Sequence, residues 1–318
     1  MRARPPPVGI RMAIGVALNA RDADNEIDAT VELAREASAA GLRSAWFGQR
    51  FGADSPALAG IVGREVPGLQ VGTSAIPIFG RHPLLVSSQA QTAQAATHGR
   101  YHLGLALGAR HLVEGGFGIP FERPIARLRE FLTALRELTE TGAADFHGEL
   151  LTATTPIPAR VQGAEAGVPL LVAAMGPQAL RVSGELADGI LPYLAGPRAL
   201  AEHIVPAVTA AAEAAGRPAP RIVALVNGVV TDDVDAVRER VAEQLAFYEK
   251  IPSYIRAIEL SGGRQAVDVA VIGNEKTVAA EVQRYRDAGA TEVVFAGTEI
   301  AGDADRRRTW ALLGELAG

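Results

Sequence analysis

The sequence predicts an α/β protein in which strands and helices alternate as in a (β/α)8 TIM barrel. The clearest unit runs from Leu69 to Gly108: a strand-like run, a turn, a helix that begins at Pro83, and a second strand-like run. Strand, helix and strand with short connections form a βαβ unit, whose strands are parallel and adjacent. About eight strands of this kind follow one another along the chain, which suits a barrel of this size.

A second observation is a repeated joint between helix and strand. A helix end, a glycine, a short turn and an apolar strand recur at Gly41, Gly99, Gly189 and Gly289. Repetition over the whole chain favours one βα architecture rather than two unlike domains. An open doubly wound sheet is the alternative, but no GxGxxG motif follows the first strand.

Local patterns predict the individual elements. In the helix expected over residues 26–40, Ile27, Val31 and Ala34 share one face, and Gly41 suits the left-handed position after its end. A long helix over residues 121–141 shows the same spacing. The other expected helices cover residues 83–97, 177–187, 197–215, 234–249, 277–288 and 303–316. The expected strands cover residues 11–18, 44–47, 69–75, 102–107, 168–174, 189–193, 221–230 and 292–296.

These elements predict one domain over residues 11–318, after a flexible tail over residues 1–10. Three stretches break the βα pattern, and we interpret them as insertions at the C-terminal rim of the strands. One of these stretches holds a hairpin around the sequence FHGELLTA. The insertions lie near residues 109–120, 143–167 and 250–273.

Composition narrows the possible partners and chemistry. A net charge of −5 without a basic run argues against nucleic acid or an acidic membrane surface as a partner. The chain has no cysteine, which excludes disulfides and thiolate chemistry. No apolar run is long enough to span a membrane and no signal peptide is recognisable, so we expect a cytoplasmic protein. The HxH, HExxH and GxSxG spacings are absent, which leaves an organic cofactor as the expected source of chemistry and no metal centre.

The C-terminal ends of the strands are the expected site. Loops near Ser74 to Ile76 and at Gly108 to His111 open on that edge. The stretch AAMGPQAL, Ala173 to Leu180, places a helix start directly after a strand. Its free N–H groups near Gly176 and Gln178 would bind phosphate; the alternative is an ordinary turn with Pro177 in the first turn of the helix.

Single polar residues allow two interpretations each. Asn19 and Asn227 end strands and could contact a ligand, although asparagine is also common in turns. His82 and His111 fall in loops at the expected active edge. Glu114 stands among apolar and glycine residues, either as a buried acid with a raised pKa or as a surface residue of a loop.

The sequence resembles the luciferase-like monooxygenase superfamily, in particular its members that use the deazaflavin coenzyme F420. The resemblance covers the chain from Ile14 onward, and the Thr-x-x-x-Pro…Arg-His-Pro block together with Ala-Ala-x-Gly-Pro is its most specific part. The matching stretches are residues 46–49 (WFGQ), 71–90, 98–108, 112–118, 170–190 and 196–208.

The resemblance implies a barrel with an insertion over its active end and a homodimer. It implies that the backbone at Ser74, Ala75 and Ile76 supports the deazaflavin ring, often through a cis peptide between non-proline residues. It also implies that residues 174–178 receive the cofactor phosphate. The expected cofactor-binding residues are Gly48, Ser74, Ala75, Ile76, Gly108, Ala109, Ala174, Met175, Gly176, Pro177 and Gln178.

One departure from the family concerns the direction of the reaction. Where sugar-phosphate and alcohol dehydrogenases of the superfamily supply acidic and histidine residues, this chain has Gly48 and Gln49. A glutamine forms hydrogen bonds but is no general base, which favours reduction of an acceptor by the reduced deazaflavin. We expect catalytic or substrate contacts from Gln49, His111 and Glu114, with His82 as the next candidate for a base.

The sequence therefore predicts an F420-dependent oxidoreductase acting on a small molecule. An FMN-dependent monooxygenase of the same fold is the first alternative, because both phosphorylated cofactors suit the same helix end. The second is a catalytically silent cofactor-binding protein, which the glutamine at position 49 would also fit. A metal-dependent hydrolase barrel lacks the necessary ligand spacing.

Overall fold

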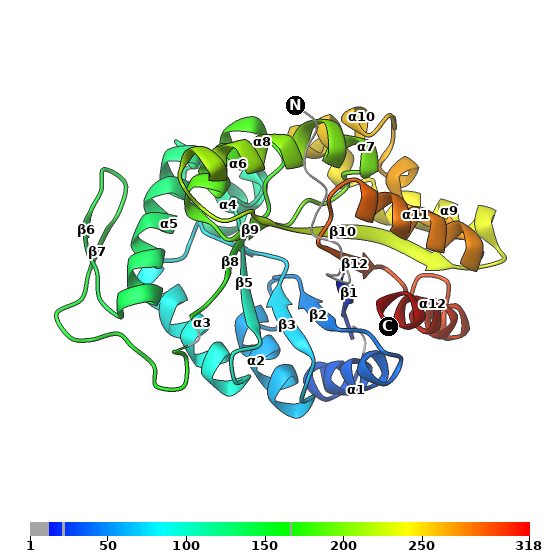
Figure 1. Ribbon diagram of the computed structural model, residues 1–318, viewed down its shortest axis with the longest axis horizontal. Helices are drawn as coiled ribbons and strands as arrows, with labels where there is room; N and C mark the ends of the chain where they lie inside the picture. Colours follow the sequence, from blue (N-terminus) through cyan, green and yellow to red (C-terminus); the bar gives the residue numbers. More distant parts are fainter. Residues whose placement is uncertain (1–12, 21–22, 166) are drawn as a thin grey trace.

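Eight parallel strands close into a barrel that helices surround (Figure 1). The computed structural model describes residues 13–20, 23–165 and 167–318, so the tail expected over residues 1–10 lies outside the described residues. The barrel closes where Arg221 pairs with Gly189, and strands one and eight meet where Ala13 pairs with Glu292. In barrel order the strands are β1 (Ala13–Ala17), β2 (Ser44–Phe47), β3 (Gln70–Thr73), β5 (Tyr101–Ala106), β8 (Leu170–Val172), β9 (Gly189–Ile190), β10 (Arg221–Val230) and β12 (Glu292–Ala296). This architecture confirms the fold class that the sequence predicts.

Helices between consecutive strands cover the outside of the barrel. Asn25 caps the first of them by accepting the N–H groups of Ile27 and Asp28, and Gly41 follows its end with φ +93°. The surrounding helices are α1 (Glu26–Ala39), α2 (Ser55–Glu65), α3 (Pro83–Ala96), α5 (Pro124–Thr141), α6 (Pro177–Leu186), α8 (Val205–Ala214), α9 (Val234–Leu245), α11 (Glu275–Asp287) and α12 (Asp303–Ala317). Their apolar faces and the strands form a continuous core that includes the fully buried Ile14, Val16 and Leu103.

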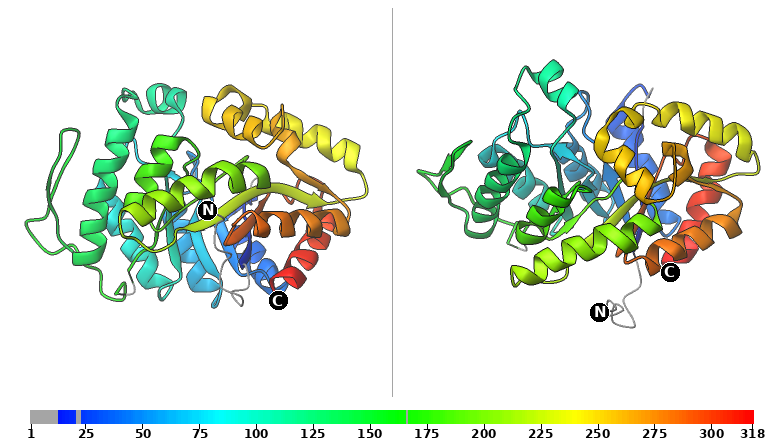
Figure 2. Two further views of the ribbon diagram at one scale, coloured as in Figure 1. Left: turned by 45° about the horizontal axis from the view of Figure 1, so that its top comes forward. Right: turned by 90° about the horizontal axis from the view of Figure 1, so that it is seen from above.

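Three stretches leave the regular pattern of the barrel. The first holds α4 (Arg110–Phe117), and the second holds the hairpin β6 (Asp145–His147) and β7 (Thr152–Thr154). The third holds α10 (Pro252–Leu260) and leads into β11 (Val271–Gly273), which pairs with the end of β10. Figure 2 shows α4 and the segment around α10 standing at one end of the barrel, whereas the hairpin projects from its side.

Some elements differ from the sequence prediction. Helix α2 was not expected from the sequence. Gly189, which the sequence predicts as a helix–strand joint, is the first residue of β9 and lacks the positive φ that Gly41, Gly99 and Gly289 adopt. The helix expected over residues 197–215 is divided into α7 (Pro197–Ala199), a π-helical turn (Leu200–Ile204) and α8. Short 3-10 turns occupy Tyr248–Lys250 and Ala266–Val269.

Candidate functional site

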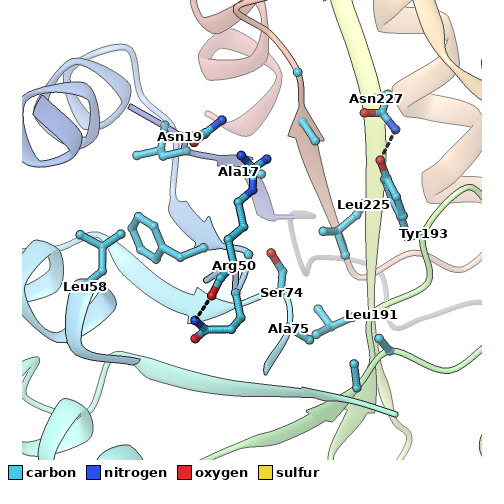
Figure 3. A pocket seen from close by; sticks show the side chains of 18 of the residues that line it. Ala17, Asn19, Arg50, Leu58, Ser74, Ala75, Leu191, Tyr193, Leu225 and Asn227 are labelled. Carbon is cyan, nitrogen blue, oxygen red and sulfur yellow. Dashed lines mark hydrogen bonds between the residues drawn. The ribbon is translucent and has the colours of Figure 1, made fainter. Parts of the chain in front are cut away.

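A cavity of about 570 Å³ lies at the C-terminal mouth of the barrel (Figure 3). Its floor consists mainly of small side chains at the ends of strands, which leaves room for a flat ligand. A side chain built at Gly48 would have only one neighbour within 4 Å, the Ser74 carbonyl oxygen at 3.7 Å. The alanines of this floor are Ala17, Ala75, Ala106, Ala173 and Ala296.

The backbone crosses the edge of this cavity between β3 and β4 (Ile76–Pro77). The peptide bond between Ser74 and Ala75 is cis, as the family resemblance implies. The N–H of Ser74 donates to the Phe47 carbonyl at 2.8 Å, which holds the turn against β2. Strand β4 then pairs with the end of β5, so Ser74 and Ala75 line the cavity while Ile76 is fully buried behind them.

Aromatic and amide side chains form the opposite wall. The hydroxyl of Tyr193 accepts a hydrogen bond of 2.9 Å from Asn227 Nδ2, which Figure 3 shows as a dashed line. The rings of Tyr248 and Tyr254 contact Tyr193 edge-on at 5.2 and 5.8 Å. Burial, and then the neighbouring Tyr248, raise the pKa values of Tyr193 and Tyr254, so both phenols stay protonated through the neutral range.

The loop after β2 supplies the third part of the wall. The amide nitrogen of Gln49 donates to the Arg50 carbonyl, and its oxygen accepts the N–H of Ser55 at 3.1 Å. Gln49 therefore shapes this loop as well as lining the cavity. In Figure 3 the exposed side chain of Arg50 extends across the cavity toward Ala17.

A second cavity of about 380 Å³ adjoins the first. It lies between the loop after β2, the end of β5 and α4. Among its lining residues are Phe51, Pro77, Leu112, Val113 and Phe117. The two cavities are neighbours, because Gln49, Arg50, Gly52, Ala75 and Ala106 line both of them.

The expected cofactor-binding residues lie in three places. Gly48, Ser74 and Ala75 line the first cavity, and Ala75, Gly108 and Ala109 line the second. Ala174, Met175, Gly176, Pro177 and Gln178 follow β8 on the same rim; Ala173, one residue earlier, lines the first cavity.

Helix α6 begins at that rim with an accessible N-terminus. Gly176 precedes it in an extended conformation, with φ −80°. A Cβ built there would meet no atom within 4 Å. The space that phosphate would need beside the first N–H groups of the helix is therefore open.

The expected catalytic residues other than Gln49 have partners elsewhere. Glu114 forms an ion pair with Arg110 at 2.8 Å and accepts the N–H of Phe121 at 3.1 Å, and its side chain is 42% exposed. His111 contacts the ring of Phe247 at 5.0 Å and so connects α4 with the segment after α9. Neither residue is among those that line the two cavities.

His82, the further candidate for a base, caps α3. Its Nδ1 accepts the N–H of Leu84, and its Nε2 donates to the Thr152 carbonyl at 2.9 Å. Sequence reasoning did not assign Arg50, Tyr193, Tyr248 and Tyr254 to the site, although all four line the first cavity. Asn227 was a candidate only because it stands near the end of an expected strand.

Among the described residues, no group of three or more His, Cys, Asp or Glu side chains is arranged to hold a metal ion. The described part of the chain also contains no helix with the length and apolar character that crossing a bilayer requires.

The family follows from comparison with known proteins. The model of the luciferase-like monooxygenase family matches residues 10–292, so the chain belongs to this family. An F420-dependent glucose-6-phosphate dehydrogenase of Rhodococcus jostii is 29% identical over 254 residues, 74% of this chain and 75% of the relative. An uncharacterized protein of Mycobacterium tuberculosis is 29% identical over 206 residues; the match spans 61% of that relative's length and 61% of this chain.

Solved structures agree on the fold. The coenzyme F420 dependent tetrahydromethanopterin reductase of Methanopyrus kandleri has a TM-score of 0.77 at 21% identity, over 96% of this chain and 98% of that one. An FMN complex of the oxygenating constituent of 3,6-diketocamphane monooxygenase from Pseudomonas putida has a TM-score of 0.76 at 16% identity, with the same coverage. At these identities the likeness concerns the barrel alone.

Proposed function

We propose that this protein is an F420-dependent oxidoreductase that reduces a small unsaturated molecule. The observation that carries the proposal is the first cavity, whose floor of alanine and glycine adjoins the Ser74–Ala75 backbone at the barrel mouth. Relatives with F420 in their names support the choice of cofactor. The N-terminus of α6 on the same rim supports it as well, because the cofactor carries a phosphate.

The residues at the mouth fit a flat ring system. Gly48 and Ala75 place no side chain beyond a methyl group against it, and Ser74 offers a polar backbone at its edge. Gly176 leaves space for a phosphate beside the first turn of α6. In its reduced form, bound F420 supplies a hydride to an electron-poor carbon of the substrate.

Reduction also requires a proton, and Tyr193 is the proposed source. Its oxygen accepts the hydrogen bond from Asn227, and its side chain also has Tyr248 as a hydrogen-bond partner. A substrate would take the place of Tyr248 as the acceptor of the Tyr193 O–H. The substrate would then gain two electrons and a proton as the hydride and one further proton from Tyr193, which would regain its proton from solvent. We give this role to Tyr193 because it lines the cavity, whereas His111 and Glu114 contact Phe247 and Arg110.

The direction of the reaction rests on Gln49. Oxidation of an alcohol would need a base close to the ring, and both polar ends of the Gln49 amide are engaged within its own loop. The proposal therefore assigns substrate reduction rather than oxidation. An FMN-dependent monooxygenase remains the second candidate, because the same fold holds FMN in a structural neighbour.

Titration and a two-way screen test this function. F420 and FMN are titrated into the pure protein, and we expect binding of F420 in the micromolar range or tighter and much weaker binding of FMN. Reduced F420 is then offered with enones, imines and quinones, and oxidised F420 with alcohols and sugar phosphates. Turnover only in the second panel would reverse the proposed direction, and tight binding of FMN alone would favour the monooxygenase. Binding of F420 without turnover in either panel would favour the silent binding protein.

A further inference from the structure

One cationic side chain reaches into the first cavity from the loop after β2. Arg50 is the only lysine, arginine or histidine among the described residues that line this cavity. Its exposed side chain extends across the cavity toward Ala17, the last residue of β1 (Figure 3). The guanidinium has no hydrogen bond or ion pair with any residue that the structure describes. Its N–H groups are therefore open to a ligand, and their planar arrangement matches the two oxygens of a carboxylate.

The backbone that carries this guanidinium is fixed by Gln49. The amide nitrogen of Gln49 donates to the Arg50 carbonyl and, at 3.4 Å, to the Ala53 carbonyl. The amide oxygen accepts the N–H of Ser55, the first residue of α2, at 3.1 Å. The loop is thus tied together between the end of β2 and the start of α2. Binding of a ligand then has to order one side chain rather than a loop, which lowers its entropic cost.

A second donor stands beside the end of β1. Asn19 follows Ala17 by two residues and lines the same cavity. In the part of the chain that the structure describes, its side-chain amide has no hydrogen-bond partner. Figure 3 shows this amide at the side of the cavity toward which Arg50 extends. An amide N–H donates to an oxygen as a guanidinium does, so the two side chains can share one carboxylate.

The strand order separates this place from the proposed phosphate site. Around the barrel, β2, β3 and β5 lie between β1 and β8 on one side, and β9, β10 and β12 lie between them on the other. The ends of β1 and β8 therefore face each other across the mouth. Helix α6, with Gly176 at its start, follows β8, whereas Arg50 extends to β1. An anion bound by Arg50 is thus a different group from a phosphate bound at α6.

Two carboxylate residues also line the first cavity and limit the charge that it accepts. Glu299 has a partner of its own. Glu26, the first residue of α1, forms no ion pair with Arg50, and its Oε2 lies 3.9 Å from a Cβ built on Gly52. The N-terminus of α1 offsets part of the charge of Glu26. One cation beside one such carboxylate suits a ligand with a single negative charge better than a dianion.

We propose that Arg50 and Asn19 bind the carboxylate of the substrate, so that the substrate is a small unsaturated monocarboxylate. The rest of this molecule lies over the alanine floor, between the end of β1 and the hydroxyl of Tyr193. This inference rests on the proposed function for the reaction. The binding that it assigns is measured with oxidised F420 or without cofactor, and neither condition provides a hydride.

Calorimetric titration with matched pairs of probes tests this site. Cyclohex-1-ene-1-carboxylate and benzoate are compared with their neutral primary amides, with and without oxidised F420. Arg50→Gln should weaken binding of both acids at least ten-fold and leave both amides within two-fold. Arg50→Lys should recover part of the loss, because it restores the charge but not the planar fork. High salt should weaken binding of the acids to the parent and leave the amides unchanged.

Three further variants test the surroundings of the guanidinium. Asn19→Leu should weaken binding of the acids about three-fold, because one donor is lost. Glu26→Gln should strengthen binding of the acids about two-fold, because it removes a charge of the same sign as the ligand's. Arg64→Gln replaces an exposed arginine on α2 that lines neither cavity. It is the matched control and should bind all four probes as the parent does.

The outcomes separate this inference from the proposed function. If neither acid binds, or if Arg50→Gln binds the acids as well as the parent does, the carboxylate site is refuted, whatever F420 does. Loss of affinity for F420 alone in Arg50→Gln would also refute it, because the arginine would then serve the cofactor. An equal loss for acids and amides would show that Arg50 only shapes the cavity. If the acids bind with the expected dependence on Arg50 while F420 does not bind, the site stands and the proposed function fails.

Discussion

His102 Nδ1 accepts a hydrogen bond of 3.1 Å from the guanidinium of Arg221 inside the barrel. Because a guanidinium only donates, this ring nitrogen carries no proton, and Nε2–H donates to Gln70 Oε1 at 3.0 Å. Arg221 also contacts Glu292 at 3.0 Å, whose carboxylate accepts the indole N–H of Trp46. Burial, and then the charge of Arg221, lower the pKa of His102 to about 3. The hydrogen-bonded network therefore requires a neutral histidine.

The first prediction is that His102 makes folding sensitive to acid. Between about pH 6.5 and pH 3 the unfolded chain binds a proton at this residue that the folded chain does not bind. The free energy of unfolding should therefore decrease as the pH is lowered from about 6.5 to about 3. This residue contributes roughly 1.4 kcal/mol to that decrease for each pH unit. In urea unfolding at pH 7.5, 5.5 and 4.5, His102→Gln should show a shallower fall than the parent. His147→Gln, on the exposed hairpin, is the control and should keep the parental slope.

The second prediction concerns the close contact between β3 and β5. Gly104 N–H donates to Thr73 Oγ1, and that hydroxyl donates to the Gly104 carbonyl. A Cβ at Gly104 would lie 1.9 Å from the Thr73 carbonyl oxygen, so the strands would have to move apart. Gly104→Ala should lower the free energy of unfolding by about 3 kcal/mol or more.

Gly115→Ala is the matched control for that change. Gly115 lies in α4, where a Cβ would meet no atom within 4 Å, and alanine should be neutral or stabilising by roughly 0.5–1 kcal/mol. Thermal and urea unfolding of both variants provide the comparison. Similar stability of the two variants would contradict the contact between Gly104 and Thr73.

The sequence predicts the barrel well because its signals are local. Apolar runs mark the strands, and Gly41, Gly99 and Gly289 mark helix ends with positive φ. Helix α2 lacked such a signal, since Gly60 and Gly63 within it argue against a helix. The structure explains Gly63, where a Cβ would lie 2.6 Å from the Thr97 side chain, whereas a Cβ at Gly60 would make an ordinary contact of 3.5 Å with Ala93. The close packing of α2 against α3 is a tertiary effect that no local pattern reports.

The site was predictable only in part, for a similar reason. Ser74, Ala75 and Gly108 are placed by strand ends, and these positions follow from the sequence pattern. Arg50 and Tyr193 reach the cavities through the paths of their loops, which depend on contacts far along the chain. The phenol of Tyr193, for example, is positioned by Asn227, which lies 34 residues away on β10. The partners of His111 and Glu114 likewise depend on how α4 folds back.

The third prediction tests the phosphate site at the start of α6. Gly176 has φ −80°, and a Cβ there meets no atom within 4 Å, so valine fits the backbone without a clash. Its branched side chain would occupy the space beside the free N–H groups. Gly176→Val should weaken F420 binding at least ten-fold, measured by fluorescence titration, while the unfolding temperature stays within a few degrees of the parent's. Unchanged affinity for F420 would show that the phosphate of F420 does not bind at the N-terminus of α6.

The fourth prediction tests Tyr193 as the proton donor. Tyr193→Phe keeps the ring contacts with Tyr248 and Tyr254 but removes the hydroxyl that accepts from Asn227. Loss of a general acid typically lowers turnover by about 10²- to 10⁴-fold, and we expect a fall of kcat in this range with the Kd of F420 within about three-fold. The absorbance of F420 follows oxidation of the reduced cofactor and gives the turnover rate. A titration of the protein with F420 gives the Kd.

Further variants and the pH profile show whether the effect is specific to the donor. Tyr285→Phe, a buried phenol on α11 that lines neither cavity, is the matched control and should keep the parental kcat. Burial raises the pKa of Tyr193, so the donor stays protonated in alkaline solution and kcat should not fall between pH 7 and 9 through its ionisation. Asn227→Leu should reduce kcat less than Tyr193→Phe does, because it removes the hydrogen bond that orients the Tyr193 hydroxyl but leaves the hydroxyl and its proton in place. Parental turnover in Tyr193→Phe would exclude this residue as the donor, and a larger loss in His111→Ala or Glu114→Ala would move the role to α4.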